Sequence, residues 1–256
     1  MNFAINTVLF PPDKLERAIH FAKELGVKLE ILPFWHEDSF CRFMDGHMAD
    51  LQGLVSSFHE PFYRCEHTAP KGTPAHQEAV DTCRKTYEYA AKLGAKQIVF
   101  HHNNCEITPE NRLEKIKYAT ENLQELNEIA AEYGLIQVIE NAGAYDKNNV
   151  LFGQEDFLAL FTQIENPCLL DLGHAHCNGW DLAQVISKLG KRICGYHVHD
   201  NNGREDSHLP LGAGTFALAP FLELYRTYTP EASLIFEYAP ETADMALIKD
   251  HMELFS

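Results

Sequence analysis

The 256-residue sequence predicts an α/β fold in which residues 1–256 form one domain, a single closed (β/α)₈ barrel. Short apolar segments alternate strictly with helical segments along the chain, which favours parallel strands joined by crossover helices. The apolar segments lack a polar/apolar alternation, as expected for strands that are buried on both faces. Eight such units fill the chain, and a barrel of this kind uses about 250 residues.

The expected strands are short runs rich in Val, Ile, Leu and Phe. The sixth run is expected to continue directly into a loop. The eight runs occupy residues 3–10, 27–34, 53–61, 96–102, 135–141, 167–175, 192–200 and 232–240.

The expected helices have apolar residues at helical spacing and residues that begin or end helices. Pro12 lies near the start of the first helix and Gly26 at its end, and Gly94, Gly134 and Gly190 end three others. The segment at 42–51 has the weakest pattern. The eight helices are expected at 11–26, 42–51, 76–94, 109–134, 155–164, 181–190, 220–228 and 241–255.

An open, doubly wound sheet is the alternative architecture. It predicts a Gly-rich phosphate loop after an early strand, and the sequence contains neither GxGxxG nor GxxxxGK[ST]. The closed barrel is therefore the favoured fold.

The composition indicates which cellular compartment and which class of partner to expect. The seven cysteines include no CxxC pair, and their odd number argues against a disulfide scaffold and for a reducing compartment. No apolar stretch approaches about 18 residues, and the N-terminus lacks the pattern of a signal peptide. We therefore expect a cytoplasmic protein.

The formal net charge of −16 gives no general attraction to nucleic acid or to an anionic membrane. A small-molecule partner is the expectation, with nucleic acid disfavoured and no membrane contact. No motif fixes the oligomeric state, which leaves a homo-oligomer open.

Potential metal ligands gather where the predicted strands end, which is where barrels of this kind build their active sites. A lone His at a strand end is more often a hydrogen-bonded structural residue, but six consecutive strands ending this way call for a shared cause. A divalent cation would compensate all of these buried groups together, and a mixed His and carboxylate set suits Zn²⁺ or Mn²⁺. The strand-end residues are His59, His101, His102, Glu140, Asp171, His174, His197, His199, Asp206, His208 and Glu237, with Glu30 inside the second strand.

Six segments resemble the xylose-isomerase-like TIM-barrel superfamily. This group includes sugar phosphate isomerases and epimerases and the AP endonucleases of family 2, the endonuclease-four type. The resemblance covers essentially the whole chain, and its most specific part is HxHDNxGxxDxHLPxGxG. The segments are FHEP (58–61), VFHH (99–102), VIENAG (138–143), LLDLGHAH (169–176), HVHDNNGREDSHLPLGAG (197–214) and LIFEYAP (234–240).

The endonuclease-four pattern implies nine ligands for up to three zinc ions, and each ligand has a counterpart here. Glu140 would bridge two ions, and Glu237 would bind in that pair. The resemblance assigns the remaining seven in three sets: His59 and His101 to one ion of the pair, Asp171 and His197 to the other, and His174, Asp206 and His208 to a third ion.

The sugar epimerase pattern implies a single ion held by Glu140, Asp171, His197 and Glu237. In this pattern Glu140 and Glu237 are also the catalytic acid/base pair that moves a proton beside a carbonyl. The expected substrate contacts are His174, His208, His199, Trp35 and Glu30, the last in a strand that resembles the "GVE" strand of the sugar enzymes.

Three functions follow. The first is a metal-dependent isomerase or epimerase acting on a sugar or sugar phosphate, favoured by the compact length and the acidic composition. The second is a metal-dependent phosphodiesterase that cuts DNA at abasic sites, favoured by the complete nine-residue set. It is opposed by the loop PFWHEDSFCRFMDGH (33–47), which carries one Arg and several acids. The third is a non-catalytic metal-binding barrel, disfavoured because Glu140 and Glu237 are both present.

Arg204 and Lys147 lie in loops beside the mouth of the barrel. Both are best explained as solvated surface residues, so no phosphate pocket is predicted there.

Overall fold

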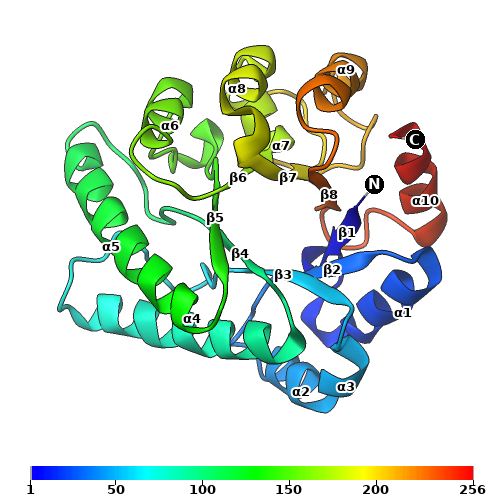
Figure 1. The fold of residues 1–256 in the computed structure, drawn as a ribbon, viewed down its shortest axis with the longest axis horizontal. Coiled ribbons are helices and arrows are strands. Elements are labelled where there is room, and N and C mark those ends of the chain that lie inside the picture. The colour runs from blue at the N-terminus through cyan, green and yellow to red at the C-terminus, as the bar shows by residue number, and fades with distance from the viewer. Residues whose placement is uncertain (1, 256) are drawn as a thin grey trace.

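Eight parallel strands close into a barrel in chain order, which confirms the predicted fold (Figure 1). The structure is a computed structural model that describes residues 2–255. Each strand pairs with its neighbours in sequence, and β8 pairs back to β1. The strands are β1 Phe3–Asn6, β2 Lys28–Ile31, β3 Val55–His59, β4 Gln97–Phe100, β5 Ile136–Glu140, β6 Cys168–Asp171, β7 Ile193–Val198 and β8 Ser233–Phe236.

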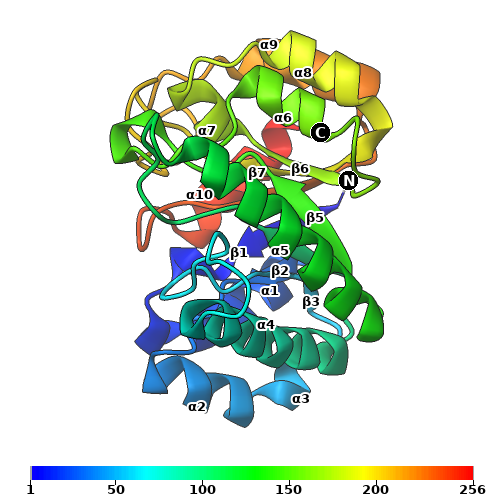
Figure 2. The same cartoon turned by 90° about the vertical axis from the view of Figure 1, so that its left-hand side faces the viewer.

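Helices surround the barrel on its outside, as Figures 1 and 2 show from two directions. No helix within residues 2–255 is long and apolar enough to span a membrane. The helices are α1 Glu16–Leu25, α2 Asp38–Gly46, α3 Met48–Leu51, α4 Pro74–Leu93, α5 Arg112–Glu132, α6 Gln154–Leu160, α7 Leu172–Cys177, α8 Leu182–Leu189, α9 Leu218–Tyr228 and α10 Met245–Leu254.

Two glycines end helices at the positions predicted. Gly26 ends α1 with a left-handed φ of 68°, and Gly94 ends α4 with a φ of 79°. Each glycine N–H bonds a carbonyl of the last helical turn. Such positive φ angles cost glycine no steric strain, so the chain can turn directly into the next strand.

The predicted continuation of the sixth strand into a loop is wrong. The strand β6 ends at Asp171, and helix α7 begins at the next residue. The Asp171 carboxylate accepts the backbone N–H of His174 at 2.7 Å and so caps this helix. The first strand is likewise shorter than predicted, because the Asn6 side chain accepts the N–H of Val8 and starts a 3-10 turn at Thr7–Leu9.

The expected helix at 42–51 is two helices. The first, α2, begins earlier than predicted, at Asp38. The helical conformation is interrupted at His47, and α3 begins at the next residue. The backbone of His47 is outside the helical region, with φ −118° and ψ 16°.

The interior of the barrel is apolar at one end and polar at the other. An apolar cluster of Ala4, Val99, Val138, Leu169 and Ile235 fills the lumen. Because side chains alternate across a strand, the residue two positions later also points inward. For these five residues the next inward positions are Asn6, His101, Glu140, Asp171 and Glu237. The fold therefore stacks a polar layer directly on the apolar one, at the carboxyl ends of the strands.

Candidate metal centre

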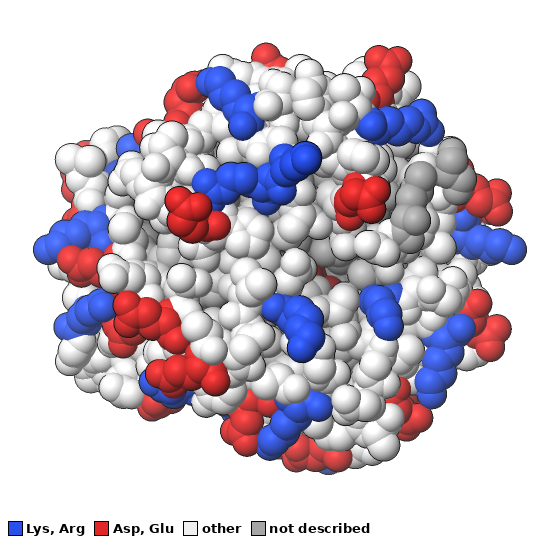
Figure 3. Space-filling view, in the orientation of Figure 1, with Lys and Arg blue, Asp and Glu red and all other residues white. Residues whose placement is uncertain are grey.

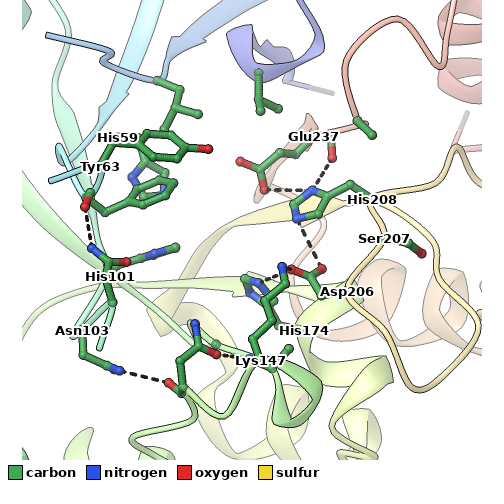
Figure 4. Close-up of a pocket in the computed structure, with 18 of the residues that line it drawn as sticks. His59, Tyr63, His101, Asn103, Lys147, His174, Asp206, Ser207, His208 and Glu237 are labelled. Carbon is green, nitrogen blue, oxygen red and sulfur yellow. Dashed lines mark hydrogen bonds and ion pairs between the residues drawn. The ribbon is translucent and has the colours of Figure 1, made fainter. Parts of the chain in front are cut away.

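A cavity of about 450 Å³ opens at the carboxyl ends of the strands (Figure 4). Glu140, Asp171 and His197 are buried and lie outside its lining, with exposed fractions of 1%, 0% and 0%. The other six residues of the nine predicted ligands line the cavity: His59, His101, His174, Asp206, His208 and Glu237.

Glu140 is the centre of the first group of contacts. One carboxylate oxygen, Oε2, lies 2.9 Å from Nε2 of His101 and 3.3 Å from Nε2 of His59. The other, Oε1, lies 3.3 Å from Nδ1 of both His174 and His197. A single carboxylate thus faces four imidazoles.

His197 is the centre of the second group. Its Nδ1 lies 3.2 Å from Oε2 of Glu237, 3.3 Å from Oε1 of Glu140 and 3.7 Å from Oδ2 of Asp171. Asp171 and His197 are register partners on adjacent strands, which fixes this arrangement. Three carboxylates and one imidazole nitrogen therefore converge on one point.

Asp206 is the centre of the third group, near the rim. Its carboxylate lies 3.4 Å from Nε2 of His174 and 3.3 Å from Nε2 of His208. Lys147 reaches the same carboxylate, with Nζ 2.6 Å from Oδ2 (Figure 4). Within residues 2–255, Lys147 is the one Lys or Arg that is ion-paired with the carboxylates of the site.

Two backbone carbonyls and the Glu30 carboxylate fix the orientation of three of these imidazoles. Nδ1 of His59 lies 3.0 Å from the Glu60 carbonyl, and Nδ1 of His208 lies 2.8 Å from the Glu237 carbonyl. Nε2 of His197 lies 2.6 Å from Glu30. Because each of these nitrogens donates outward, the other ring nitrogen is left facing the carboxylates of the site, as in metal-bound histidines.

The site contains buried polar atoms that have no hydrogen-bond partner. Among the described residues these include Glu140 Oε1, His174 Nδ1, His197 Nδ1 and Asp206 Oδ1. An imidazole lone pair that faces carboxylate oxygens is repelled by them unless a cation or a proton lies between. The orphaned atoms and the donor set therefore fit a divalent metal ion.

Without metal ions, protons on the histidines and on Glu237 would have to offset the negative charge of the site, and the pKa shifts of these groups reflect this. Burial raises the pKa of Glu140, but His101 and His197 outweigh burial and hold that pKa well below its usual range. Burial also raises the pKa of Glu237, and here it prevails over His197 and His208. Burial lowers the pKa of His208, but Asp206 outweighs it and raises the pKa to about 9. Bound cations would take the place of such protons.

The loop after β7 is held by Asp200. Its carboxylate accepts the backbone N–H groups of Gly212 at 2.9 Å, Gly214 at 3.1 Å and Phe216 at 2.9 Å. His208 lies in this loop with a φ of 48°, a left-handed conformation that is uncommon outside glycine. The HxHDNxGxxDxHLPxGxG motif is thus the framework that delivers Asp206 and His208 to the mouth.

His199 packs under this loop and does not line the cavity. Its ring stacks on His208 with centroids 3.8 Å apart, and its Nε2 lies 3.1 Å from Asp171. A Cβ on Gly173 would lie 1.9 Å from the His199 ring, so only glycine fits there.

Two further predicted substrate contacts also lie off the cavity wall. Glu30 is fully buried beneath His197. Trp35 points away, because its Nε1 donates to Thr86 at 2.8 Å and its ring packs on Phe40 and Tyr89. The aromatic residues that do line the cavity are Phe62 and Tyr63.

Lys147 is exposed, in keeping with its surface interpretation, but it also lines the cavity and pairs with Asp206, which was not predicted. Its position shortly after the VIENAG segment was the available signal. Arg204 makes no side-chain contact to the site among the described residues and fits its surface interpretation.

Comparison with protein families gives one match that covers most of the chain. A family described as "Xylose isomerase-like TIM barrel" matches residues 44–256. Two curated relatives from Methanocaldococcus jannaschii are uncharacterized: MJ1614, 32% identical over 136 residues, and MJ1311, 28% identical over 152 residues. The matched regions are 53% and 56% of this chain, and the chain spans about half the length of each relative, 52% and 51%.

Solved structures share the fold over nearly their full length. A D-tagatose 3-epimerase-like protein has a TM-score of 0.76 at 21% identity, covering 99% of this chain and 96% of that one. The IOLI protein with a bound zinc atom has a TM-score of 0.76 at 18% identity, with the same coverage. A family 2 AP endonuclease from Brucella melitensis has a TM-score of 0.75 at 16% identity, covering 98% of each chain.

Proposed function

The chain belongs to the xylose isomerase-like TIM barrel family, and we propose that it is a metal-dependent isomerase or epimerase acting on a small sugar or sugar phosphate. The observation that carries this proposal is the convergence of Glu140 and Glu237 on one point beside His197, next to a cavity of about 450 Å³. That volume suits a small polar molecule. Similar folds in proteins described as D-tagatose 3-epimerase-like and D-allulose 3-epimerase support the substrate class.

Four residues would hold the first ion: Glu140, Asp171, His197 and Glu237. His59 and His101 could hold a second ion with Glu140, and His174, Asp206 and His208 a third. We propose one to three Zn²⁺ or Mn²⁺ ions per chain on this basis. A divalent ion bound there supplies a Lewis acid that polarises a carbonyl oxygen.

The chain itself supplies the proton transfers. One of the two glutamates removes a proton from the carbon beside the carbonyl, and the other returns a proton on the opposite face of that carbon. Asn6 orients Glu237 by donating to its Oε1 at 2.8 Å, which leaves Oε2 on the side of His197. His174 and His208, which line the cavity, would position hydroxyl groups of the substrate, and Phe62 and Tyr63 would contact it from one wall.

The alternative function is an AP endonuclease-type phosphodiesterase. The observation that favours it is that the structure brings all nine residues of the three-ion pattern to one mouth. The charge distribution favours the sugar enzyme, since duplex DNA binding needs a basic surface. The formal net charge is −16, and within residues 2–255 Lys147 is the one Lys or Arg that lines the cavity. The face shown in Figure 3 is the one on which the N-terminal end of the chain lies, away from the mouth, and on its described part acidic and basic side chains are interspersed.

The compartment proposed for this activity is reducing, in keeping with a cytoplasmic enzyme. All seven cysteines are unpaired in the structure.

A two-arm assay tests the proposal. Metal-loaded protein is incubated with a panel of ketoses and ketose phosphates in D₂O and, separately, with a DNA duplex that contains one abasic site. We expect deuterium at the carbon beside the carbonyl of one sugar and no strand cleavage. Strand cleavage without deuterium in any sugar would establish the phosphodiesterase instead, and neither reaction would favour the non-catalytic barrel.

A further inference from the structure

A second cluster of polar side chains is sealed between the barrel and helix α4, outside the lumen. We name Glu60, His67, Cys83, Tyr87 and Gln137 the outer cluster. Glu60 follows β3, His67 lies in the segment that joins β3 to α4, and Cys83 and Tyr87 lie on α4. Every member is at most 1% exposed, and none lines the mouth cavity. The outer cluster is therefore separate from the proposed active site.

One half of the outer cluster is well paired. Oε1 of Glu60 accepts hydrogen bonds from the Tyr87 hydroxyl and from Nε2 of Gln137, the latter at 2.7 Å. Burial raises the pKa of Glu60 to about 8, and the two donors oppose this shift in part by favouring the ionised carboxylate. These contacts fix the Glu60 side chain, so that its second oxygen points at the remaining members.

Several other polar atoms of the outer cluster have no hydrogen-bond partner. Among the described residues, Glu60 Oε2, both ring nitrogens of His67 and Gln137 Oε1 are buried and unpaired. Nε2 of His67 lies 3.7 Å from Oε2 of Glu60, which is too long for a hydrogen bond. Each polar atom left unpaired in an apolar layer destabilises the fold. A ligand between them would remove that destabilisation.

The spacing of the outer cluster matches the spacing of ligands around one ion. One donor atom each from Glu60, His67 and Cys83 lies within 4.8 Å of the other two. An oxygen and a nitrogen ligand about 2.0–2.2 Å from a tetrahedral Zn²⁺ are roughly 3.3–3.6 Å from one another. The 3.7 Å between Glu60 and His67 is close to this spacing, and a small side-chain shift would bring both onto one ion.

We propose that the outer cluster binds a structural Zn²⁺ ion through Glu60, His67 and Cys83. The carboxylate and a thiolate balance the charge of the ion, so that the buried site is neutral overall. Gln137 Oε1, buried and unpaired in the same cluster, offers a fourth donor. The ion ties α4 and the segment before it to the barrel.

The burial of the outer cluster affects both the protonation state of the Cys83 thiol and the stage at which the ion can enter. Without an ion, burial raises the pKa of Cys83 well above its usual range, so the thiol stays protonated. A coordinating thiol is deprotonated by the metal. Because the outer cluster is closed to solvent, the ion must enter as the chain folds, and a short chelator treatment that strips the mouth should leave it in place.

Cobalt substitution distinguishes this site from the mouth, because none of the nine proposed mouth ligands is a cysteine. Protein produced in cobalt-supplemented medium should show a near-ultraviolet thiolate-to-Co²⁺ charge-transfer band that survives brief chelation. Cys83→Ser should abolish the band and lower the metal content by one ion per chain. The matched control is Cys177→Ser, whose sulfur lies 3.4 Å from the His174 carbonyl near the mouth, and it should keep the band.

X-ray absorption at the zinc edge tests the proposal on the unaltered protein, so the result does not depend on a variant folding. We expect one sulfur scatterer at about 2.3 Å from zinc. Zinc without any sulfur ligand, or a cobalt band that persists in Cys83→Ser, would overturn the proposal. The outer cluster would then be a protonated Glu60–His67 pair without an ion.

Discussion

Nε2 of His197 lies 2.6 Å from a carboxylate oxygen of Glu30, and both residues are fully buried. Glu30 is itself held by Ser57, which donates to it at 2.7 Å, and by Asn6, which donates at 3.0 Å. This carboxylate fixes the imidazole so that Nδ1 faces Glu140, Asp171 and Glu237. We propose Glu30 as a positioning residue of the metal centre in place of a substrate contact.

Replacing Glu30 by Gln removes the charged acceptor and keeps the side-chain volume. We expect the affinity for the first metal ion to fall about 10- to 100-fold, as when other outer partners of metal-bound histidines are removed. Competition with a chromophoric chelator measures this change. The exposed Glu165→Gln, whose side chain makes no contact with the site, is the matched control and should leave the affinity unchanged. Equal affinities in the two variants would show that Glu30 does not orient His197.

Replacing Glu237 by Gln removes one partner of the proposed acid/base pair. We expect kcat for the sugar reaction to fall about 10²- to 10⁴-fold with little change in KM, because the amide cannot exchange the proton. Circular dichroism and metal content check that the barrel and the remaining ligands persist. Unchanged deuterium incorporation in this variant would show that Glu237 takes no part in the proton transfer.

Lys147 and a third metal ion compete for Asp206, since the ammonium lies 2.6 Å from its Oδ2. Lys147→Met should therefore raise the affinity for the third ion, the one proposed to bind Asp206. The gain should be about fivefold, because solvent screens the half-exposed lysine end of the pair and limits its contribution to about 1 kcal/mol. Calorimetric metal titration measures it, with the exposed Lys188→Met as control. A lower affinity in Lys147→Met would mean that the lysine supports the site.

His251 gives a pH dependence that lies away from the metal centre. Its Nδ1 is 2.8 Å from the Tyr238 hydroxyl, and burial lowers the pKa of His251 in the folded protein below its ordinary value. Since the unfolded chain then takes up the proton first, this group destabilises the fold as the pH falls through about 6.5. Urea unfolding at pH 8 and pH 5.5 should show a smaller acid-induced loss in His251→Gln than in the wild type. The exposed His20→Gln should behave as the wild type, and an identical loss in all three proteins would refute this role.

The barrel and the placement of the strand-end residues follow from local sequence patterns. Apolar runs place the strands, and the two-residue period that puts Val138 inward also puts Glu140 inward. Parallel strands bring these ends to one edge, so residues far apart in sequence meet at the mouth. The metal-binding roles of these residues remain predictions.

Side-chain depth and direction depend on contacts that no local pattern contains. Trp35 turns from the cavity because Thr86, far along the chain, accepts its N–H. Glu30 sinks beneath His197 because Asn6 and Ser57 occupy the same layer. Lys147 reaches the cavity because the loop after β7 places Asp206 beside it. Each outcome is set by a tertiary partner.

Metal content of the purified native protein tests the central claim most directly. Elemental analysis should find at least one divalent ion per chain, and Asp171→Asn with His197→Ala should remove the ion of the first site together with the activity. A protein that is metal-free as purified and fully active, with or without added chelator, would contradict the metal centre and the function built on it.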